Sequence, residues 1–313
     1  LFGLSVLGGS RTSLAWLPWL VGVVAMVGGV FSVLYSLRMR RLDPGDLSSS
    51  NPVLGVLRIL AVLAITLVGV ALIFLLSLLP IRRQGIRIHY WMTTWICRLV
   101  NRLLRIRVLC REPEKLFALR GILFLNHISF LDIPVAIAVL PLRFLSTSDV
   151  FQVPFVGWAA EAVSTVFVDR KSQDSRRDVR TAIAKRVADE PYPPFVIFPE
   201  GRFGTATSLR PFHYGSFEIA AQHSIPYLPC GLRYDRNDIA LWKGVKTESF
   251  FAAAARVFSF RGDIHAELLP LTEITPTPSQ PSAQLAQDAQ RAVETALGFA
   301  PSETMLLESG GNS

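Results

Sequence analysis

The fold is decided by the stretch GILFLNHISFLD, residues 121–132. Its apolar first part, Gly121–Leu125, is typical of a buried strand, and the residues after it predict a turn where that strand ends. On one unbroken helix His127 and Asp132 would point about 140° apart, so a contact between them requires such a turn. Pro134 suits the first turn of a helix that begins there.

His127 and Asp132 together indicate a catalytic base. A carboxylate that binds one imidazole nitrogen fixes the tautomer and leaves the other nitrogen free to take a proton. Many such pairs are structural, so the pair alone is weak evidence. Two more apolar segments, Val166–Arg170 and Phe195–Arg202, also end in charged residues. Because open α/β sheets bind ligands beyond the carboxyl ends of their strands, the three segments point to one shared site.

From about Leu109 the chain alternates strand-like and helix-like segments, which is the pattern of an α/β domain. The predicted strands are Gly121–Leu125, Ser164–Val168, Phe195–Phe198, Tyr227–Arg233 and Asp263–Leu269. The predicted helices are Pro134–Leu140, Phe155–Val163, Asp174–Asp189 and Ser216–Gln222. A proline-rich segment at 275–281 ends the domain, and Ser279 or Ser282 is expected to cap a last helix that runs to Leu297.

Two long apolar segments precede this domain. Leu14–Leu37 carries no charge, and Val53–Leu79 is interrupted only by Arg58. Each is long enough to span the ~30 Å hydrocarbon core of a bilayer, which predicts a transmembrane hairpin; buried helices of a soluble protein are the alternative. Arginines in the connecting loop and after the second segment give opposite orientations under the positive-inside rule, so the orientation stays open.

The segment Tyr90–Val108 is amphipathic. Trp91, Trp95 and Leu99 share one face, and arginines occupy the opposite face. This pattern is typical of a helix in the lipid headgroup layer and also of a surface helix packed on the next domain; both can hold at once. We therefore expect a transmembrane hairpin at 1–85, an interfacial helix with an α/β domain at 86–275, and a C-terminal helix and tail at 276–313.

The composition narrows the class of partner. The formal charge of +8 favours an acidic partner such as anionic lipid or acyl-carrier protein, and no nucleic-acid recognition motif is present. Cys97, Cys110 and Cys230 are odd in number and lack C-x-x-C spacing, so we expect neither a disulfide framework nor a metal site.

Four sequence blocks resemble the glycerolipid acyltransferase family that includes 1-acylglycerol-3-phosphate acyltransferase. They are NH-x4-D at Asn126–Asp132, an apolar strand ending in D-R at Val166–Arg170, F-P-E-G at Phe198–Gly201, and a proline-framed strand at Ile225–Pro229. The resemblance covers roughly Arg120 to Tyr234. It implies a mixed sheet flanked by helices, and transfer of a fatty acyl group from acyl-CoA or acyl-carrier protein to the hydroxyl of a lysolipid.

The resemblance also implies roles for individual residues. His127 is the general base and Asp132 orients it; no cofactor and no covalent acyl-enzyme are needed, since the thioester donor is already activated. No G-x-S-x-G motif is present, and Ser129 is interpreted as a turn former rather than a nucleophile. The predicted substrate-binding residues are Asn126, Ser129, Arg170, Glu200, Gly201 and Arg202, with the two arginines facing anionic groups.

Three positions depart from the family pattern. Family members commonly read F-P-E-G-T-R-S, whereas this chain has Arg202 one place early and Phe203 in the usual arginine position. Thr147 and His213 stand where lysines are common; His213 is interpreted as a pocket-lining or packed residue rather than a second base. Each lost charge-assisted hydrogen bond removes roughly 1.5–3 kcal/mol from phosphate binding. We therefore expect the acceptor to be a lysophospholipid with a larger or zwitterionic head, or an ornithine-type lyso-aminolipid, rather than simply lysophosphatidate.

Two alternatives remain from the sequence: a lipid or thioester hydrolase that uses the same pair on water, and a non-catalytic membrane protein that binds lysolipid or acyl-CoA. The excess of Arg over Lys hints at a bacterial source. The expected location is the bacterial inner membrane, with the catalytic domain on the cytoplasmic side.

Overall fold

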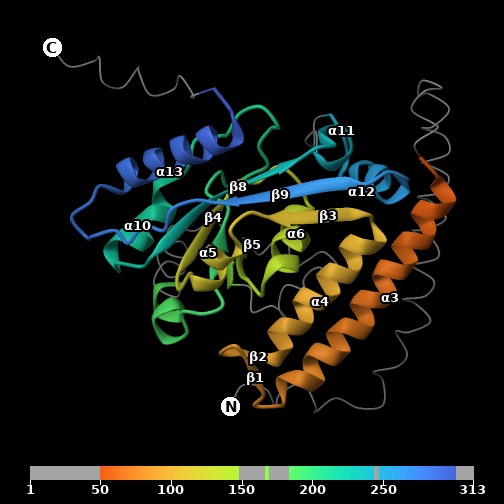
Figure 1. Ribbon diagram of the computed structural model, residues 1–313, viewed down its shortest axis with the longest axis horizontal. Helices are drawn as coiled ribbons and strands as arrows, with labels where there is room; N and C mark the ends of the chain where they lie inside the picture. Colours follow the sequence, from red (N-terminus) through yellow and green to blue (C-terminus); the bar gives the residue numbers. More distant parts are fainter. Residues whose placement is uncertain (1–49, 148–165, 169–182, 243–246, 301–313) are drawn as a thin grey trace.

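The computed structural model describes residues 50–147, 166–168, 183–242 and 247–300 (Figure 1). The first predicted apolar span, Leu14–Leu37, and the predicted helix Phe155–Val163 lie outside these residues. In chain order the elements are α3 (Pro52–Ser77), β1 (Arg82–Arg83), β2 (Ile86–Arg87), α4 (Ile88–Leu103), β3 (Ile106–Cys110), α5 (Pro113–Ala118), β4 (Ile122–Leu125), α6 (Asp132–Val139), β5 (Arg143–Thr147), β6 (Val166–Val168), β7 (Phe195–Ile197), α10 (Tyr214–Gln222), β8 (Tyr227–Tyr234), α11 (Asn237–Ala240), α12 (Phe250–Ser259), β9 (Ile264–Pro270) and α13 (Ser282–Leu297).

The main sheet has the strand order β3-β9-β8-β4-β7-β5-β6. Strands β4, β5, β6, β7 and β8 are parallel, and β9 runs antiparallel to β8. The sheet is mixed and flanked by helices, which confirms the predicted fold class. The five predicted strands are all present as β4, β6, β7, β8 and β9, with small shifts at their ends.

Strand β4 lies inside the sheet, and all four of its residues are completely buried. Leu123 and Leu125 pack into the core beneath α6 and α12, whereas Ile122 and Phe124 pack into a second core beneath α10 and α13. This period-2 alternation between two apolar faces explains why β4 reads as an unbroken apolar run. Gly121 starts the strand because a Cβ there would collide with the Pro226 carbonyl oxygen.

Helix α3 matches the second predicted apolar span. The side chain of Asn51 caps it by accepting a hydrogen bond from the amide of Leu54 at 3.1 Å. The mean hydropathy of its most apolar 18-residue window is 3.1, and only 11% of that window is buried, so α3 is long and apolar enough to cross a membrane. A hairpin is not established, because its first half lies outside the described residues.

Helix α3 lies against α12 in its first half and against α4 in its second half (Figure 1). Near its start, Arg58 is buried and donates to the carbonyls of Phe258 and Phe260 at 3.0 and 2.5 Å, at the carboxyl end of α12. Near its end, Gly69 packs so closely on Ile96 of α4 that a Cβ would collide with that side chain.

The predicted helix Tyr90–Val108 is wrong at its carboxyl end. Helix α4 ends at Leu103, Arg105 has a φ of 59°, and the chain continues as β3, which pairs with β9. A left-handed residue ends the helix, and strand pairing over the following residues overrides their helical pattern. Both expected settings of α4 are compatible with the structure, because it packs on α3 and α6 while Trp95 and Leu99 stay exposed.

Three smaller points concern the ends of α13, the predicted helix Asp174–Asp189, and a strand that the sequence did not predict. Helix α13 begins at Ser282 with Pro281 as its N-cap, and neither serine provides a capping side chain. The predicted helix Asp174–Asp189 is described only at 183–189, where it is helical. Strand β5 was not predicted, and it pairs with β7 and β6.

Candidate active site

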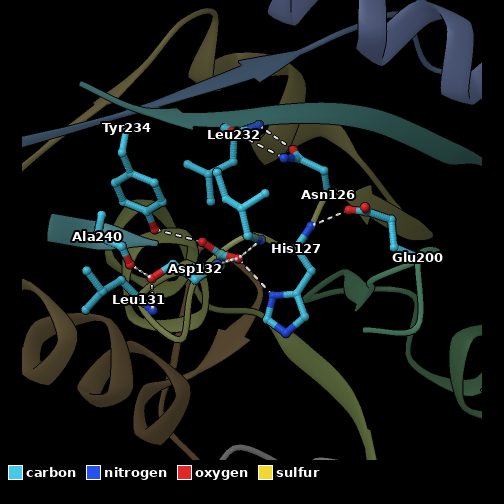
Figure 2. A network of polar contacts seen from close by, with 10 residues as sticks. Asn126, His127, Leu131, Asp132, Glu200, Leu232, Tyr234 and Ala240 are labelled. Carbon is cyan, nitrogen blue, oxygen red and sulfur yellow. Dashed lines mark hydrogen bonds and ion pairs between the residues drawn. The ribbon is translucent and has the colours of Figure 1, made fainter. Parts of the chain in front are cut away.

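His127 follows β4, and Asp132 is the first residue of α6. The turn between them brings Nδ1 of His127 to 2.8 Å from Oδ2 of Asp132, which confirms the predicted contact. The Asp132 side chain is completely buried, and that of His127 is 14% exposed. Figure 2 shows the second ring nitrogen of His127 turned away from Asp132. That nitrogen, Nε2, is therefore the one available for proton transfer.

The carboxylate of Asp132 is also the centre of its own turn. Its Oδ2 accepts the main-chain amides of Ile128 and Ser129 at 2.8 and 2.9 Å, and its Oδ1 accepts the hydroxyl of Tyr234 at 2.8 Å (Figure 2). Burial and the neighbouring Asp132 carboxylate raise the pKa of Tyr234 well above its usual value, so the phenol stays protonated and donates. Four donors thus hold the carboxylate in one orientation beneath the imidazole.

Asn126 and Ser129 support the turn from inside the protein. The Asn126 side chain donates to the carbonyl of Leu232 at 3.0 Å and accepts its amide at 2.6 Å, which extends the β4–β8 pairing past the strand end. The Ser129 hydroxyl donates to the carbonyl of Ala240 at 2.5 Å. Both residues are completely buried. This geometry does not support the expectation that they bind substrate, and it supports the interpretation of Ser129 as a turn former.

Glu200 connects the turn after β7 to the turn after β4. Its Oε1 accepts the main-chain amide of His127 at 2.8 Å (Figure 2). Its Oε2 accepts the amide of Arg210 at 2.9 Å. Burial raises the pKa of Glu200, while these two amides act in the opposite direction. Gly204 donates to the His127 carbonyl at 2.6 Å, and a Cβ on Gly204 would lie only 2.5 Å from Oε2 of Glu200. Glu200 therefore positions His127 through the main chain.

The imidazole of His127 lies between two aromatic rings. Phe198 stacks on it at a centroid distance of 4.0 Å and 19°, and Phe203 lies on it at 4.0 Å and 35°. Phe203 is the residue in the usual arginine position of the family motif, and sequence reasoning did not foresee its contact with the base. The two rings exclude water from the faces of the imidazole and fix the direction of Nε2.

The predicted cationic residues take other positions. Arg202 is exposed and forms no hydrogen bond or ion pair with the part of the chain that the structure describes. Arg210, which was not predicted, donates from Nε to the Phe203 carbonyl at 2.9 Å. Gly201 has a φ of 65° and lies beside the exposed ring of His213. Arg170 lies outside the described residues.

Neither metal ligands nor a reactive thiol accompany His127 in the described ranges. No group of three or more His, Cys, Asp or Glu side chains with metal-binding geometry occurs there. Burial raises the pKa of Cys97 and of Cys110 to about 12, and that of Cys230 further still. These thiols stay protonated at neutral pH and are poor nucleophiles.

Known proteins are similar to this chain in sequence and in fold. A family model described as Acyltransferase matches residues 107–233. The lyso-ornithine lipid O-acyltransferase of Pseudomonas aeruginosa is 35% identical over 188 residues, which are 57% of this chain and 69% of that protein. The chain belongs to the acyltransferase family. This confirms the resemblance drawn from the four sequence blocks and the prediction that the protein is an acyltransferase.

More distant relatives agree with this assignment. The lyso-ornithine lipid O-acyltransferase of Rhodobacter capsulatus is 25% identical over 66% of this chain and 75% of its own. The 1-acyl-sn-glycerol-3-phosphate acyltransferase of Neisseria gonorrhoeae is 29% identical over 35% of this chain and 42% of its own. The crystal structure of PlsC from Thermotoga maritima, an LPA acyltransferase, matches this acyltransferase with a TM-score of 0.55 and 18% identity, over 77% of this chain and 96% of that one. That match shows a shared fold.

Proposed function

We propose that this acyltransferase moves a fatty acyl group from acyl-CoA or acyl-carrier protein to the hydroxyl of a lysolipid. Nε2 of His127 takes the proton of the acceptor hydroxyl while the hydroxyl oxygen attacks the thioester carbonyl carbon. The tetrahedral intermediate then collapses, the C–S bond breaks, and the proton on Nε2 passes to the departing thiolate. The products are an acylated lipid and a free thiol, so no cofactor is consumed.

The observation that carries the proposal is the His127–Asp132 contact at 2.8 Å, with Nε2 left free. The buried carboxylate fixes the neutral tautomer with hydrogen on Nδ1, and it stabilises the imidazolium that forms during the reaction. Ser129 donates to Ala240 and is buried, so it is not placed to form an acyl-enzyme. Direct attack by the acceptor hydroxyl is the route that fits these residues.

We further propose that the acceptor is a lyso-aminolipid of the ornithine type. Two relatives carry the name lyso-ornithine lipid O-acyltransferase. Ornithine is an amino acid, so such a headgroup need not contain a phosphate. The ring of Phe203 covers the base in the position where the family commonly has its arginine. The exposed guanidinium of Arg202 at the rim is free to meet the carboxylate of such a headgroup.

The proposed location is a bacterial inner membrane, with the active site on the cytoplasmic side where the thioester donors are made. Helix α3 supports membrane attachment, because most of its surface is apolar and exposed. It contacts α12, the helix whose residue Phe250 lies against Phe130 in the catalytic turn. Helix α12 therefore connects the apolar α3 with the turn that carries His127, and it offers a path for substrate drawn from the lipid layer.

The test uses the purified full chain with one acyl-CoA and three acceptors: lyso-ornithine lipid, lysophosphatidate and lysophosphatidylethanolamine. We expect transfer to lyso-ornithine lipid and its loss in a folded His127→Ala variant, with product measured by mass spectrometry. Full activity of that variant removes His127 from the mechanism. A strong preference for lysophosphatidate refutes the proposed acceptor, and acyl-CoA consumption without any acceptor indicates a hydrolase.

A further inference from the structure

A row of aromatic side chains leads outward from the catalytic imidazole. Phe203, which lies on His127, makes an edge contact with Trp242 at 4.9 Å between ring centroids. Trp242 makes an edge contact with Phe250 at 6.2 Å, and Phe250 contacts Phe251 at 6.1 Å. We call Phe203, Trp242, Phe250 and Phe251 the aromatic rail. Its outer end is open to solvent, since Phe250 is 45% and Phe251 66% exposed.

The middle of the aromatic rail is fixed by polar contacts behind it. Nε1 of Trp242 donates to the carbonyl of Glu248 at 3.0 Å. The buried carboxylate of Glu248 pairs with Arg256 of α12, and the Arg256 guanidinium also donates to the carbonyl of Leu241 at 2.5 Å. These contacts tie the residue before Trp242 and the residues before α12 to one guanidinium. The relative position of Trp242 and Phe250 is thus set by the fold.

The outer end of the aromatic rail lies on α12, the helix that contacts the apolar α3. Helix α12 begins with Phe250 and Phe251, and its carboxyl end accepts two hydrogen bonds from Arg58 of α3. A helix of this length covers about 15 Å. Val53, in the first turn of α3, is 67% exposed. An apolar group that leaves the aromatic rail at Phe251 therefore has about 15 Å of α12 to follow to the contact with α3, the helix that is suited to contact lipid.

No uncompensated cation borders the outer part of the aromatic rail among the described residues. Arg256 pairs with Glu248, and Arg236 pairs with Asp238 at 2.6 Å. A phosphate group held along Trp242 and Phe250 would be desolvated against the rings, and both of these described guanidinium groups are already paired with carboxylates, which is unfavourable. An alkyl chain in the same place would replace water on both surfaces, which is favourable.

We propose that the aromatic rail binds the alkyl chain that carries the acceptor hydroxyl and guides it from the lipid layer to Nε2 of His127. The acceptor is then selected by its apolar chain next to the hydroxyl, while its headgroup stays at the rim near Arg202. This inference rests on the proposed function, and it adds Trp242 and Phe250 as residues that determine specificity. Neither takes part in proton transfer.

The experiment compares two lyso-ornithine lipids whose hydroxyacyl chains have about eight and about sixteen carbons. Both are presented to the full-length enzyme at equal mole fraction in detergent micelles, and KM and kcat are measured separately. In the wild type we expect a lower KM for the long chain, because only that chain is long enough to cover the exposed rings of Phe250 and Phe251 and displace water from them. In Trp242→Ala and Phe250→Ala we expect KM for the long chain to rise at least about tenfold, with kcat within about threefold.

The matched control is Phe299→Ala, which truncates a partly buried ring that packs against the other core beyond α13 and should leave both KM values unchanged. Phe250 is half exposed, so Phe250→Ala keeps the test valid if Trp242→Ala fails to fold. If KM rises equally for the short and the long acceptor in these variants, or does not change, the proposed role of the aromatic rail is refuted while the proposed function stands. If the wild type acylates no lysolipid, the proposed function itself fails.

Discussion

The substitution Asp132→Asn separates the charge of the carboxylate from its geometry. An asparagine fits with its oxygen in place of Oδ2, where it accepts from His127 and the two main-chain amides, and with its NH2 in place of Oδ1. The hydroxyl of Tyr234, a donor to Oδ1 in the wild type, rotates to accept from that NH2. The turn keeps its hydrogen bonds, so the variant should fold.

The magnitude follows from the ion pair that forms in the transition state. At the observed separation of 2.8 Å and an effective dielectric constant of about 20, a full imidazolium and a carboxylate attract by about 6 kcal/mol. With the proton about half transferred, about 3 kcal/mol of this stabilises the transition state, which corresponds to about a hundredfold in rate. We expect kcat to fall by about a hundredfold, with KM for the acceptor nearly unchanged.

The assay measures kcat and KM with lyso-ornithine lipid and one acyl-CoA, and urea unfolding of each variant provides the control. Unfolding should show a loss of about 1–2 kcal/mol, because neutral hydrogen bonds replace charge-assisted ones. If Asp132→Asn keeps kcat within about threefold of the wild type, the carboxylate charge does not stabilise the imidazolium and the mechanism is refuted. If the variant fails to fold, the predicted rotation of the Tyr234 hydroxyl is wrong.

Three further predictions concern the surrounding residues. Phe203→Arg should raise kcat/KM for lysophosphatidate relative to lyso-ornithine lipid by about tenfold or more, since one charge-assisted hydrogen bond contributes roughly 1.5–3 kcal/mol; an unchanged ratio of the two values contradicts this. Burial raises the pKa of Glu200, so its protonation stabilises the folded state fully below the ordinary pKa of about 4.3, and this contribution is lost as the pH rises through the raised value. Glu200→Gln should therefore weaken this fall in the free energy of unfolding with rising pH, as measured by urea unfolding at several pH values. At neutral pH the variant should lose about 1–3 kcal/mol of stability, because one main-chain amide then faces the NH2 group of the glutamine. Arg58→Met removes both hydrogen bonds that Nη1 of Arg58 donates to the end of α12, so amide hydrogen exchange there should speed up. Arg291→Met, at an exposed ion pair, should leave that exchange unchanged.

The structure could be predicted from the sequence where it follows from the pattern of neighbouring residues. The apolar run of β4 alternates between two cores, so its burial is encoded in its own residues. The contact between His127 and Asp132 follows because the carboxylate accepts amides only a few residues away and closes the turn from within. The change from strand to turn to helix was therefore predictable from that stretch of sequence.

The sequence predictions are wrong or incomplete where contacts between segments far apart in the chain determine the structure. Strand β3 has a helical pattern but pairs with β9, which lies far along the chain. Tyr234 donates to Asp132 from the end of β8, and its only signal in the sequence was its place directly after a predicted strand. The contact of Phe203 with the imidazole depends on how two strand-end turns meet in space. No periodic pattern of residues in the sequence indicates any of these three contacts.

The site has two parts. One set of residues positions His127 whatever the substrate is, and a second set lies around Nε2 where a substrate would approach. Asp132 and Glu200 both use their carboxylates largely on main-chain amides, so the most recognisable motif residues build two turns and fix one reacting atom, Nε2 of His127. The same frame serves any acceptor that brings a hydroxyl to that nitrogen. The residues that select the acceptor must therefore be those around Nε2. In this chain they are first Phe203, which lies on the imidazole, and then Trp242, which contacts Phe203. On the proposed mechanism, replacing a cation by a ring leaves the acid–base chemistry intact and is expected to favour a hydrocarbon chain over a phosphate beside Nε2.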